Sequence, residues 1–280
     1  MENRILREFI QRSLEEDLGD GDHSSLACIP PGIKGKARLI IKEKGVLAGI
    51  KVAREVFTVI DKELILEVLK DDGSNVLPGE TVFNLSGQQQ SILKSERLVL
   101  NIMQRMSGIA TSTREYVQRL KGLKTRILDT RKTTPGIRFI EKEAVRIGGG
   151  FNHRMGLYDM IVLKDNHIDY AGGIEKAIRL TREYLERNNL TMKVVIEARN
   201  LDDVNKIVAT GSIDRIMLDN FSIGDTLTAV KLIAGQFETE SSGGITLETV
   251  RDYAECGVDY ISVGALTHHM KSLDMSLKAY

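Results

Sequence analysis

The stretch from Thr125 to His167 reads TRILDTRKTTPGIRFIEKEAVRIGGGFNHRMGLYDMIVLKDNH and indicates how the chain folds. It contains two short apolar runs, 127–128 and 160–163, and charged residues follow each run at once. In α/β barrels the active site lies just past the carboxyl ends of the strands. Between Lys124 and Arg154 there are eight Lys or Arg residues against three acids. We interpret this basic excess as a site for a polyanionic small molecule.

The same pattern continues towards the C-terminus. Runs of strand length lie at 126–129, 160–164, 193–198, 215–219, 237–241 and 259–264, with helix-like segments at 138–146, 173–189, 202–210, 223–234 and 247–256. Strands that alternate with helices predict a parallel sheet with right-handed crossovers. Neither GxGxxG nor a Walker A sequence is present, and every run ends in polar or small residues. These features favour a barrel over an open nucleotide-binding sheet.

The N-terminal part has a different texture. Apolar residues have helical spacing over 5–18. The segment GDGDHSSLACIPPG (19–32) has the composition of a loop. The segment KARLIIKEKGVLAG (36–49) predicts two strands around a Lys-Gly turn. We expect a small sheet with a helix at 51–60 packed on it. A long helical stretch, 91–123, carries the transition to the next domain, and Ser107-Gly108 predicts a kink or a division in it.

Composition excludes several classes of protein. The 280 residues carry 39 Lys or Arg and 39 Asp or Glu, and this balance argues against binding to nucleic acid or to a membrane surface. No segment is long and apolar enough to span a bilayer, and the charged N-terminus lacks the apolar core of a signal peptide. Cys28 and Cys256 are far apart, which predicts a cytoplasmic protein without a disulfide framework or a zinc site.

Two acids and two glycine-containing segments follow later strands. Glu197 and Asp219 each end an apolar run, so they could hold Mg²⁺ or accept hydrogen bonds from sugar hydroxyls. Structural pairing with a nearby Lys or Arg is the alternative. Glycines that follow a strand and precede a helix allow backbone N–H groups to approach a phosphate, although a tight turn also explains them. They occur in the segments 241–246 and 264–268.

The basic side chains at the strand ends suit carboxylates or phosphates. They are Arg131, Lys132, His153, Arg154 and Lys164, and Arg97 and Arg105 read as solvated helix residues when taken alone. A Schiff-base lyase that uses Lys132 or Lys164 is one alternative, because barrel aldolases place their lysines at strand ends. A phosphate-ligand-binding protein without catalysis is the other.

Long segments resemble one known family, quinolinate phosphoribosyltransferase, the carboxylating nicotinate-nucleotide pyrophosphorylase of NAD biosynthesis. The resemblance runs in order over nearly the whole chain. The segments that carry it are EKGVLAG (43–49), SERLVLNIMQRMSGIAT (95–111), DTRKTTPGIR (129–138), GGGFNHRMGLYDMIVLKDNHI (148–168), IMLDNF (216–221), ESSGGI (240–245) and DYISVGALTH (259–268).

The resemblance implies a type II phosphoribosyltransferase fold. An N-terminal α/β sandwich, residues 1–108, would be followed by an α/β barrel of incomplete regularity, residues 109–265, and residues 266–280 would return to the first domain. It also implies a homodimer in which Arg97 enters the neighbouring active site, with any larger assembly left open. The enzyme would convert quinolinate and phosphoribosyl pyrophosphate, with Mg²⁺, into nicotinate mononucleotide, pyrophosphate and CO₂.

The resemblance also implies a role for each candidate residue. Quinolinate would be bound by Arg97, Arg131, His153, Arg154 and Lys164. The catalytic residues would be Lys132, Glu197 and Asp219, the two acids contacting ribose directly or through Mg²⁺, and the 5′-phosphate would be bound by Ser242, Gly243, Gly244 and Gly264. The family often has a second acid shortly after the position of Glu197, where this chain has Ala198-Arg199. That departure keeps open a related transferase with another substrate.

Overall fold

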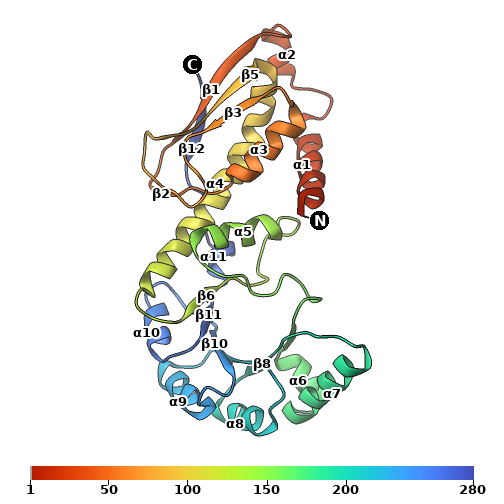
Figure 1. Cartoon of the computed structure of the whole chain (residues 1–280), viewed down its shortest axis with the longest axis vertical. Helices are drawn as coiled ribbons and strands as arrows, with labels where there is room; N and C mark the ends of the chain where they lie inside the picture. Colours follow the sequence, from red (N-terminus) through yellow and green to blue (C-terminus); the bar gives the residue numbers. More distant parts are fainter. Residues whose placement is uncertain (1) are drawn as a thin grey trace. The chain divides into compact units, whose positions relative to one another are not determined.

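The computed structural model describes residues 2–280, and the chain divides into two compact units (Figure 1). The first unit comprises the residues up to Ser112 together with Pro135–Gly148 and His269–Tyr280. The second comprises Thr113–Thr134 and Gly149–His268. Both units are α/β, which confirms the expected class. The domain boundaries expected from the sequence, after residues 108 and 265, stay predictions.

A four-stranded antiparallel sheet forms the centre of the first unit. Its strand order is β12-β1-β5-β3, with bounds β12 Met275–Ala279, β1 Lys34–Ile41, β5 Thr81–Gln88 and β3 Ile65–Val68. Alternate residues of β1 are buried (Ala37, Leu39 and Ile41), as expected for a strand with one covered face. Helix α3, Ile50–Ile60, covers that core, and the Phe57 and Phe83 rings meet edge to face at 5.7 Å. Helix α1, Glu2–Leu18, packs beside α3.

One local expectation in this unit was wrong, and another is confirmed. The segment expected to be a loop contains a short helix, α2 (His23–Cys28), because the Asp22 carboxylate caps it by accepting the Ser25 N–H at 3.1 Å. The two strands around the Lys-Gly turn exist, but they do not pair with each other. Strand β1 joins the larger sheet, whereas β2 (Gly45–Val46) pairs with β4 (Asn75–Val76) in a separate ladder.

The long helix α4, Gln89–Arg119, is continuous, so the expected division at Ser107-Gly108 was wrong. Within the first unit, the Ser107 hydroxyl accepts the Ala48 N–H at 2.9 Å and donates to the Ala48 carbonyl at 3.1 Å. Gly108 lets the chain near Lys271 approach: a Cβ at this position would lie 2.1 Å from the Lys271 carbonyl oxygen. These small residues therefore serve close packing.

Helix α5, Arg138–Gly148, also belongs to the first unit. Its Glu141 side chain has no exposed surface and accepts from Arg105 Nε of α4 at 2.8 Å. Phe139 meets the Phe9 ring of α1 edge to face at 6.0 Å. The segment 125–167 is thus divided between the two units, because its middle part, α5, packs within the first unit.

The second unit contains one sheet of six parallel strands, in the order β6-β11-β10-β9-β8-β7. All six strands expected from the sequence are confirmed, with bounds β6 Arg126–Leu128, β7 Ile161–Leu163, β8 Val194–Ala198, β9 Arg215–Asp219, β10 Glu238–Ser242 and β11 Tyr260–Ser262. The order leaves β6 and β7 at the two edges, and an isolated bridge joins Leu128 of β6 to Phe151. The barrel is therefore incompletely closed.

Helices follow these strands along the chain, and all but the last of them neighbour one another in sequence order (Figure 1). Their bounds are α6 Asp165–Ala171, α7 Ile174–Arg187, α8 Leu201–Thr210, α9 Ile223–Ile233, α10 Val250–Glu255 and α11 Ala265–His268. The short helices α6 and α11 were not expected from the sequence. Among residues 2–280, no helix has both the length and the apolar character needed to cross a membrane.

Candidate active site

The carboxyl ends of the parallel strands bring most of the candidate residues to one edge of the second unit. Parallel strands all point the same way, so residues that end or directly follow them share an edge. Arg131 and Lys132 follow β6, Lys164 follows β7, Glu197 lies in β8 and Asp219 ends β9. Ser242 ends β10, Gly243 and Gly244 follow it, and Gly264 follows β11. The register places Glu197 beside Met217, two residues before Asp219.

Lys164 and Glu197 form an ion pair across the ends of β7 and β8. The Glu197 side chain is 6% exposed and the Lys164 side chain 50% exposed. The second Glu197 oxygen accepts the Asp165 N–H at 3.2 Å, at the first residue of α6. Negative charge is stabilised at a helix N-terminus. The Glu197 side chain is thus held by two contacts, one of them with Lys164 at the same edge.

Arg131 is close enough to Arg154 to affect the pKa of the Arg154 guanidinium. Burial lowers the pKa of the Arg154 guanidinium from its ordinary value, and the positive charge of Arg131 lowers it further. Asp159 and Glu197 oppose this change. Arg154 Nη1 donates to the Met160 carbonyl at 3.1 Å, and this hydrogen bond fixes the position of the Arg154 side chain. Two guanidinium groups held near each other form a strong field for an anion with two carboxylates.

His153 is held from several directions. Its backbone N–H donates to Asp129 Oδ1 at 2.8 Å, and Asp129 is buried at the end of β6. Its ring Nδ1 accepts the Arg154 N–H at 2.7 Å, and Nε2 lies 3.4 Å from Glu240 Oε2. The His153 side chain is only 8% exposed. The structure therefore places the residue beside the cationic group but largely inside the protein.

Lys132 lies over the end of β11. The Lys132 carbonyl accepts a hydrogen bond from the Thr267 hydroxyl at 2.7 Å, and the Lys132 N–H donates to Thr130 Oγ1 at 3.0 Å. A Cβ on Gly264 would lie 3.1 Å from Lys132 Cδ and 2.9 Å from His268 Nε2. Glycine at 264 therefore leaves room for the lysine stem and the imidazole, which connects the ends of β6 and β11.

The loop after β10 is built around Asn220. Gly243 has a φ of +95°, and a Cβ there would meet Asn220 Oδ1 at 2.2 Å. Asn220 itself donates through its backbone to the Ser242 carbonyl at 2.8 Å and through Nδ2 to Asp219 Oδ2 at 2.8 Å. The glycine loop and Asp219 are thus parts of one hydrogen-bonded arrangement.

The residues present are compatible with Mg²⁺. Among the described residues, 2–280, no group of three or more His, Cys, Asp or Glu side chains is placed to hold a metal ion. Magnesium is commonly held by one or two protein carboxylates together with substrate phosphates and water, so it does not need a cage of protein ligands. Glu197 and Asp219, on adjacent strands, meet that smaller requirement.

Two further residues named in the sequence take no part in the contacts described so far. Arg97 is an exposed residue of α4 in the first unit, whereas the other candidate residues belong to the second. Arg199, at the position where the sequence departs from the family, is bound by acids of two neighbouring helices. Its Nη1 lies 3.0 Å from Asp169 of α6 and its Nε lies 3.2 Å from Asp203 of α8. Arg199 therefore acts as a link between helices.

Sequence reasoning missed the charges inside the sheet. Glu240 and Arg215 are both buried and form an ion pair of 2.8 Å between β10 and β9. The sequence suggested that Glu240 stands at a strand end, but β10 runs to Ser242 and places it mid-strand. A charged residue within a buried parallel strand was the available signal, because such strands are normally apolar.

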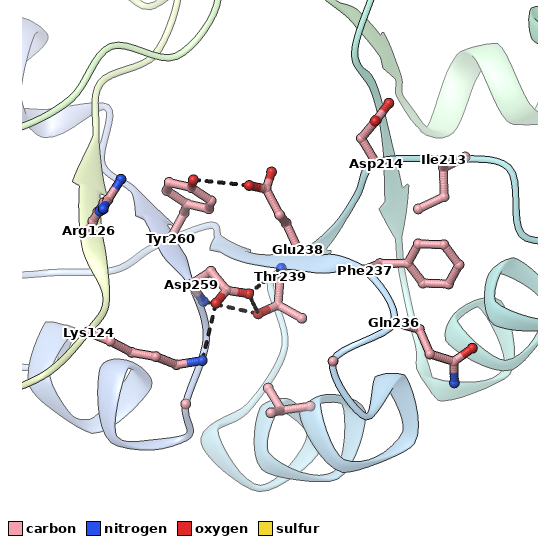
Figure 2. Close-up of a pocket in the computed structure, with 13 residues that line it drawn as sticks. Lys124, Arg126, Ile213, Asp214, Gln236, Phe237, Glu238, Thr239, Asp259 and Tyr260 are labelled. Carbon is pink, nitrogen blue, oxygen red and sulfur yellow. Dashed lines mark hydrogen bonds and ion pairs between the residues drawn. The ribbon is translucent and has the colours of Figure 1, made fainter.

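A polar pocket lies at the opposite edge of the sheet, where the strands begin (Figure 2). Figure 2 shows the Tyr260 hydroxyl directed to Glu238 and the Asp259 carboxylate directed to Thr239 and Lys124. These groups bind one another at the amino ends of β6, β10 and β11. In barrels this edge serves stability, whereas chemistry occurs at the carboxyl edge. We therefore locate the candidate site at the carboxyl edge.

The fold and the site together define an α/β enzyme that handles small anionic substrates. Comparison with known families specifies the class further. A family model described as quinolinate phosphoribosyl transferase, C-terminal domain, matches residues 109–278, and the corresponding N-terminal domain model matches residues 22–107.

Similar proteins carry the same description. Quinolinate phosphoribosyltransferase (decarboxylating) 1b of Nicotiana tabacum is 46% identical over 98% of this chain and 82% of its own length. A probable carboxylating nicotinate-nucleotide pyrophosphorylase of Synechocystis is 40% identical over 98% of this chain and 92% of its own. The solved nicotinate-nucleotide pyrophosphorylase of Francisella tularensis is 40% identical, with a TM-score of 0.93 over 99% of this chain and 97% of that one. The chain belongs to the quinolinate phosphoribosyltransferase family, which confirms the resemblance seen in the sequence.

Proposed function

We propose that this protein transfers the phosphoribosyl group of phosphoribosyl pyrophosphate to quinolinate and releases CO₂. The products are nicotinate mononucleotide and pyrophosphate, and the reaction belongs to NAD biosynthesis. The observation that carries the proposal is the Lys164–Glu197 ion pair. In this pair a cationic group suited to a dicarboxylate lies beside a carboxylate suited to the ribose, at the carboxyl edge where barrel enzymes have their active sites.

In this proposal the cationic group binds and orients quinolinate. Arg131, Arg154 and Lys164 bind its two carboxylates, with His153 beside them and Arg97 supplied by the first unit of a partner chain. The backbone donors of the loops after β10 and β11 bind the 5′-phosphate. They belong to Ser242, Gly243, Gly244 and Gly264, and Gly243 and Gly244 have positive φ values that open the loop after β10. Lys132 faces the pyrophosphate.

The chemistry then proceeds by position and charge. The quinolinate nitrogen bonds to C1 of the ribose as the C1–oxygen bond to pyrophosphate breaks. Positive charge develops on the sugar in this step, and the carboxylates of Glu197 and Asp219 stabilise it. Glu197 and Asp219 would hold Mg²⁺, which would supply positive charge to neutralise the leaving pyrophosphate.

Decarboxylation follows from the product of the first step. The ring nitrogen is now positive, so the bond from C2 to its carboxylate breaks, CO₂ leaves and the electron pair remains on C2. A proton then completes nicotinate mononucleotide. No covalent bond to the protein is needed, and positioning with electrostatic stabilisation is sufficient.

The Schiff-base alternative is disfavoured by the ion pair itself. A Schiff base requires a lysine amine that is free to attack a carbonyl, whereas Lys164 Nζ is engaged in the ion pair with Glu197. Borohydride in the presence of a carbonyl substrate should therefore leave no covalent adduct on Lys164 or Lys132, which mass spectrometry of the intact chain would check.

We also propose a homodimer with shared active sites, in which Arg97 of one chain completes the site of its partner. Arg97 is exposed and belongs to a different unit from the other quinolinate-binding residues. We further propose a cytoplasmic protein, since Cys28 and Cys256 are both free thiols, which fits a reducing compartment.

Turnover with labelled substrate tests the proposed function. The protein is incubated with Mg²⁺, phosphoribosyl pyrophosphate and quinolinate carrying ¹³C in either its 2-carboxyl or its 3-carboxyl group. We expect labelled CO₂ from the first substrate, and nicotinate mononucleotide that retains the label from the second. The proposal is wrong if neither the nucleotide nor CO₂ forms.

A further inference from the structure

The interior of the second unit holds a row of charged side chains that the roles above do not use. Glu240 of β10 has no exposed surface, and its Oε2 lies 2.8 Å from Arg215 Nη1 and 3.4 Å from His153 Nε2. Arg215 is 6% exposed, also binds Glu238 at 3.0 Å and stacks 3.9 Å over the Tyr260 ring. The row runs from the amino edge of the sheet, seen in Figure 2, to the loop that holds His153.

Burying these charges costs free energy, which favourable contacts must offset. Barrel interiors are mostly filled by Val, Ile and Leu, and moving charges out of water costs several kcal/mol per ion in order of magnitude. Burial opposes ionisation of Glu240, yet its interactions, among them the contact of 2.8 Å with the Arg215 guanidinium, hold the pKa of its carboxyl below the ordinary value. Glu240 is thus a buried carboxylate, and the imidazole is one of its two partners.

The hydrogen bonds of His153 determine which ring nitrogen carries a proton. A neutral imidazole has one donor nitrogen and one acceptor nitrogen. Nδ1 accepts the Arg154 N–H at 2.7 Å, so this nitrogen carries no proton. Nε2 faces the Glu240 carboxylate, which can only accept, so the proton lies there. Nδ1 thus has a hydrogen-bond partner, and Nε2 has the Glu240 carboxylate at ion-pair distance without a formed hydrogen bond.

We propose that Glu240 is a positioning residue that holds His153 as the neutral Nε2–H tautomer, and that His153 in turn fixes the backbone presenting Arg154. His153 then shapes the quinolinate pocket without serving as one of its cations. The effect on quinolinate binding rests on the proposed function, whereas the tautomer does not.

Nitrogen NMR of the enzyme tests the tautomer directly. The protein is labelled with ¹⁵N-histidine, and the His153 signals are assigned by their absence in His153→Gln. We expect a protonated Nε2 and an unprotonated Nδ1 near neutral pH, both without ligand and after quinolinate is added. A doubly protonated ring in either state, or a proton on Nδ1, would overturn the proposal even if the protein turned over quinolinate normally.

Paired variants test the positioning role. Glu240→Leu removes the acceptor, Glu240→Gln keeps an acceptor oxygen without the charge, and Glu238→Leu removes a partner of Arg215 that does not touch His153. We expect Glu240→Leu to lose the Nε2–H signature and raise KM for quinolinate by about tenfold, equivalent to one hydrogen bond. Glu240→Gln should keep the signature and a KM near that of the wild type.

The matched controls decide the interpretation. If Glu238→Leu changes the His153 signals and KM as much as Glu240→Leu, the row has only a structural role and the proposal fails. It also fails if Glu240→Gln behaves like Glu240→Leu, since the acceptor would then be irrelevant. Should Glu240→Leu not fold, the Glu240→Gln signals and the wild-type spectrum still decide the tautomer.

Discussion

At the scale of single residues, Gly243 shows how one amino acid connects two parts of the site. Its φ of +95° is unfavourable for residues with a Cβ, and a Cβ would also meet the Asn220 backbone nitrogen at 2.9 Å. Gly244 has a φ of +61° but no atom within 4 Å of such a Cβ. Alanine at 244 would therefore meet backbone strain alone, whereas alanine at 243 would meet both backbone strain and steric overlap.

We therefore predict different costs for alanine at these two positions. Gly244→Ala should lower the free energy of unfolding by about 1–2 kcal/mol, from the left-handed backbone alone. Gly243→Ala adds displacement of Asn220, so its loss should be larger, and KM for phosphoribosyl pyrophosphate should rise more. Urea unfolding and steady-state kinetics check this, and equal losses would contradict the role of Asn220.

A second residue-scale prediction concerns Asp259 at the start of the β11 region. Although burial opposes its ionisation, the N–H and hydroxyl of Thr239, at 2.9 and 2.8 Å, and Lys124 hold its pKa below the ordinary 3.8 (Figure 2). The ionised carboxylate therefore stabilises the fold above the unfolded-state pKa, and that contribution is lost as the pH falls through the lower folded-state pKa.

Asp259→Asn should accordingly be less stable than the wild type at neutral pH. The difference in the free energy of unfolding should shrink as the pH is lowered below 3.8. Urea titrations of both proteins at a series of pH values measure it. A difference that stayed constant down to the acid limit would show that the carboxylate charge is not the cause.

The sequence indicated which residues stand at the strand ends, but not how they pair. Lys164 and Glu197 were both identified from the apolar runs that precede them, whereas their ion pair depends on β7 lying next to β8. Glu240 was placed at a strand end, and its contact with Arg215 requires the β9–β10 register. Contacts between distant residues follow from strand order, which the local pattern does not contain.

At the scale of secondary structure, helix α4 contains a glycine that close contact with a neighbouring segment requires. A Cβ on Gly108 would overlap the Lys271 carbonyl at 2.1 Å and Met270 Cε at 2.7 Å. The chain that leads into β12 therefore lies against this helix, within the first unit. Backbone atoms cannot move aside as a flexible side chain can.

Gly108→Ala should destabilise the protein by about 1–3 kcal/mol, as is typical of overpacking. Gly224→Ala, in α9, is the matched control because the nearest atom to its added Cβ is Ser222 Oγ at 3.8 Å. Alanine there should stabilise the helix by up to about 1 kcal/mol. Thermal unfolding followed by circular dichroism distinguishes the two, and changes of the same sign would contradict this account.

The elements missed by the sequence are short. Helix α2 has six residues and α6 has seven, too few to show an apolar period, and α2 is started by the Asp22 cap. Most of the six parallel strands were found because apolar residues dominate them and polar ones follow, whereas β10 is polar throughout (ETESS). Periodicity identifies long elements, whereas capping decides the short ones.

At the scale of the whole molecule, the order of elements along the chain differs from their grouping in space. Strand β12 pairs with β1 in the first sheet, with Leu277 opposite Leu39. The sequence suggested this return only through the family resemblance. The membership of α5 in the first unit had no local signal, since it is an ordinary amphipathic helix between two barrel strands.

The shared site of the proposed dimer makes a prediction for mixed chains. Arg97→Ala and Lys132→Ala should each be nearly inactive alone, yet after subunit exchange a mixed pair holds one site free of both changes. An equal mixture should regain roughly a quarter of wild-type activity, because half of the pairs are mixed and each has one intact site. If exchange is confirmed by mass spectrometry and no activity returns, the site is not shared.

The central claim is that quinolinate and the sugar phosphate meet at the carboxyl edge of the second unit. A crystal structure with quinolinate and a non-reactive analogue of phosphoribosyl pyrophosphate tests it most directly. We predict the quinolinate carboxylates against Arg131, Arg154 and Lys164, and the 5′-phosphate on the loops of Gly243 and Gly264. Quinolinate bound instead at the amino edge, in the pocket of Figure 2, would contradict the account.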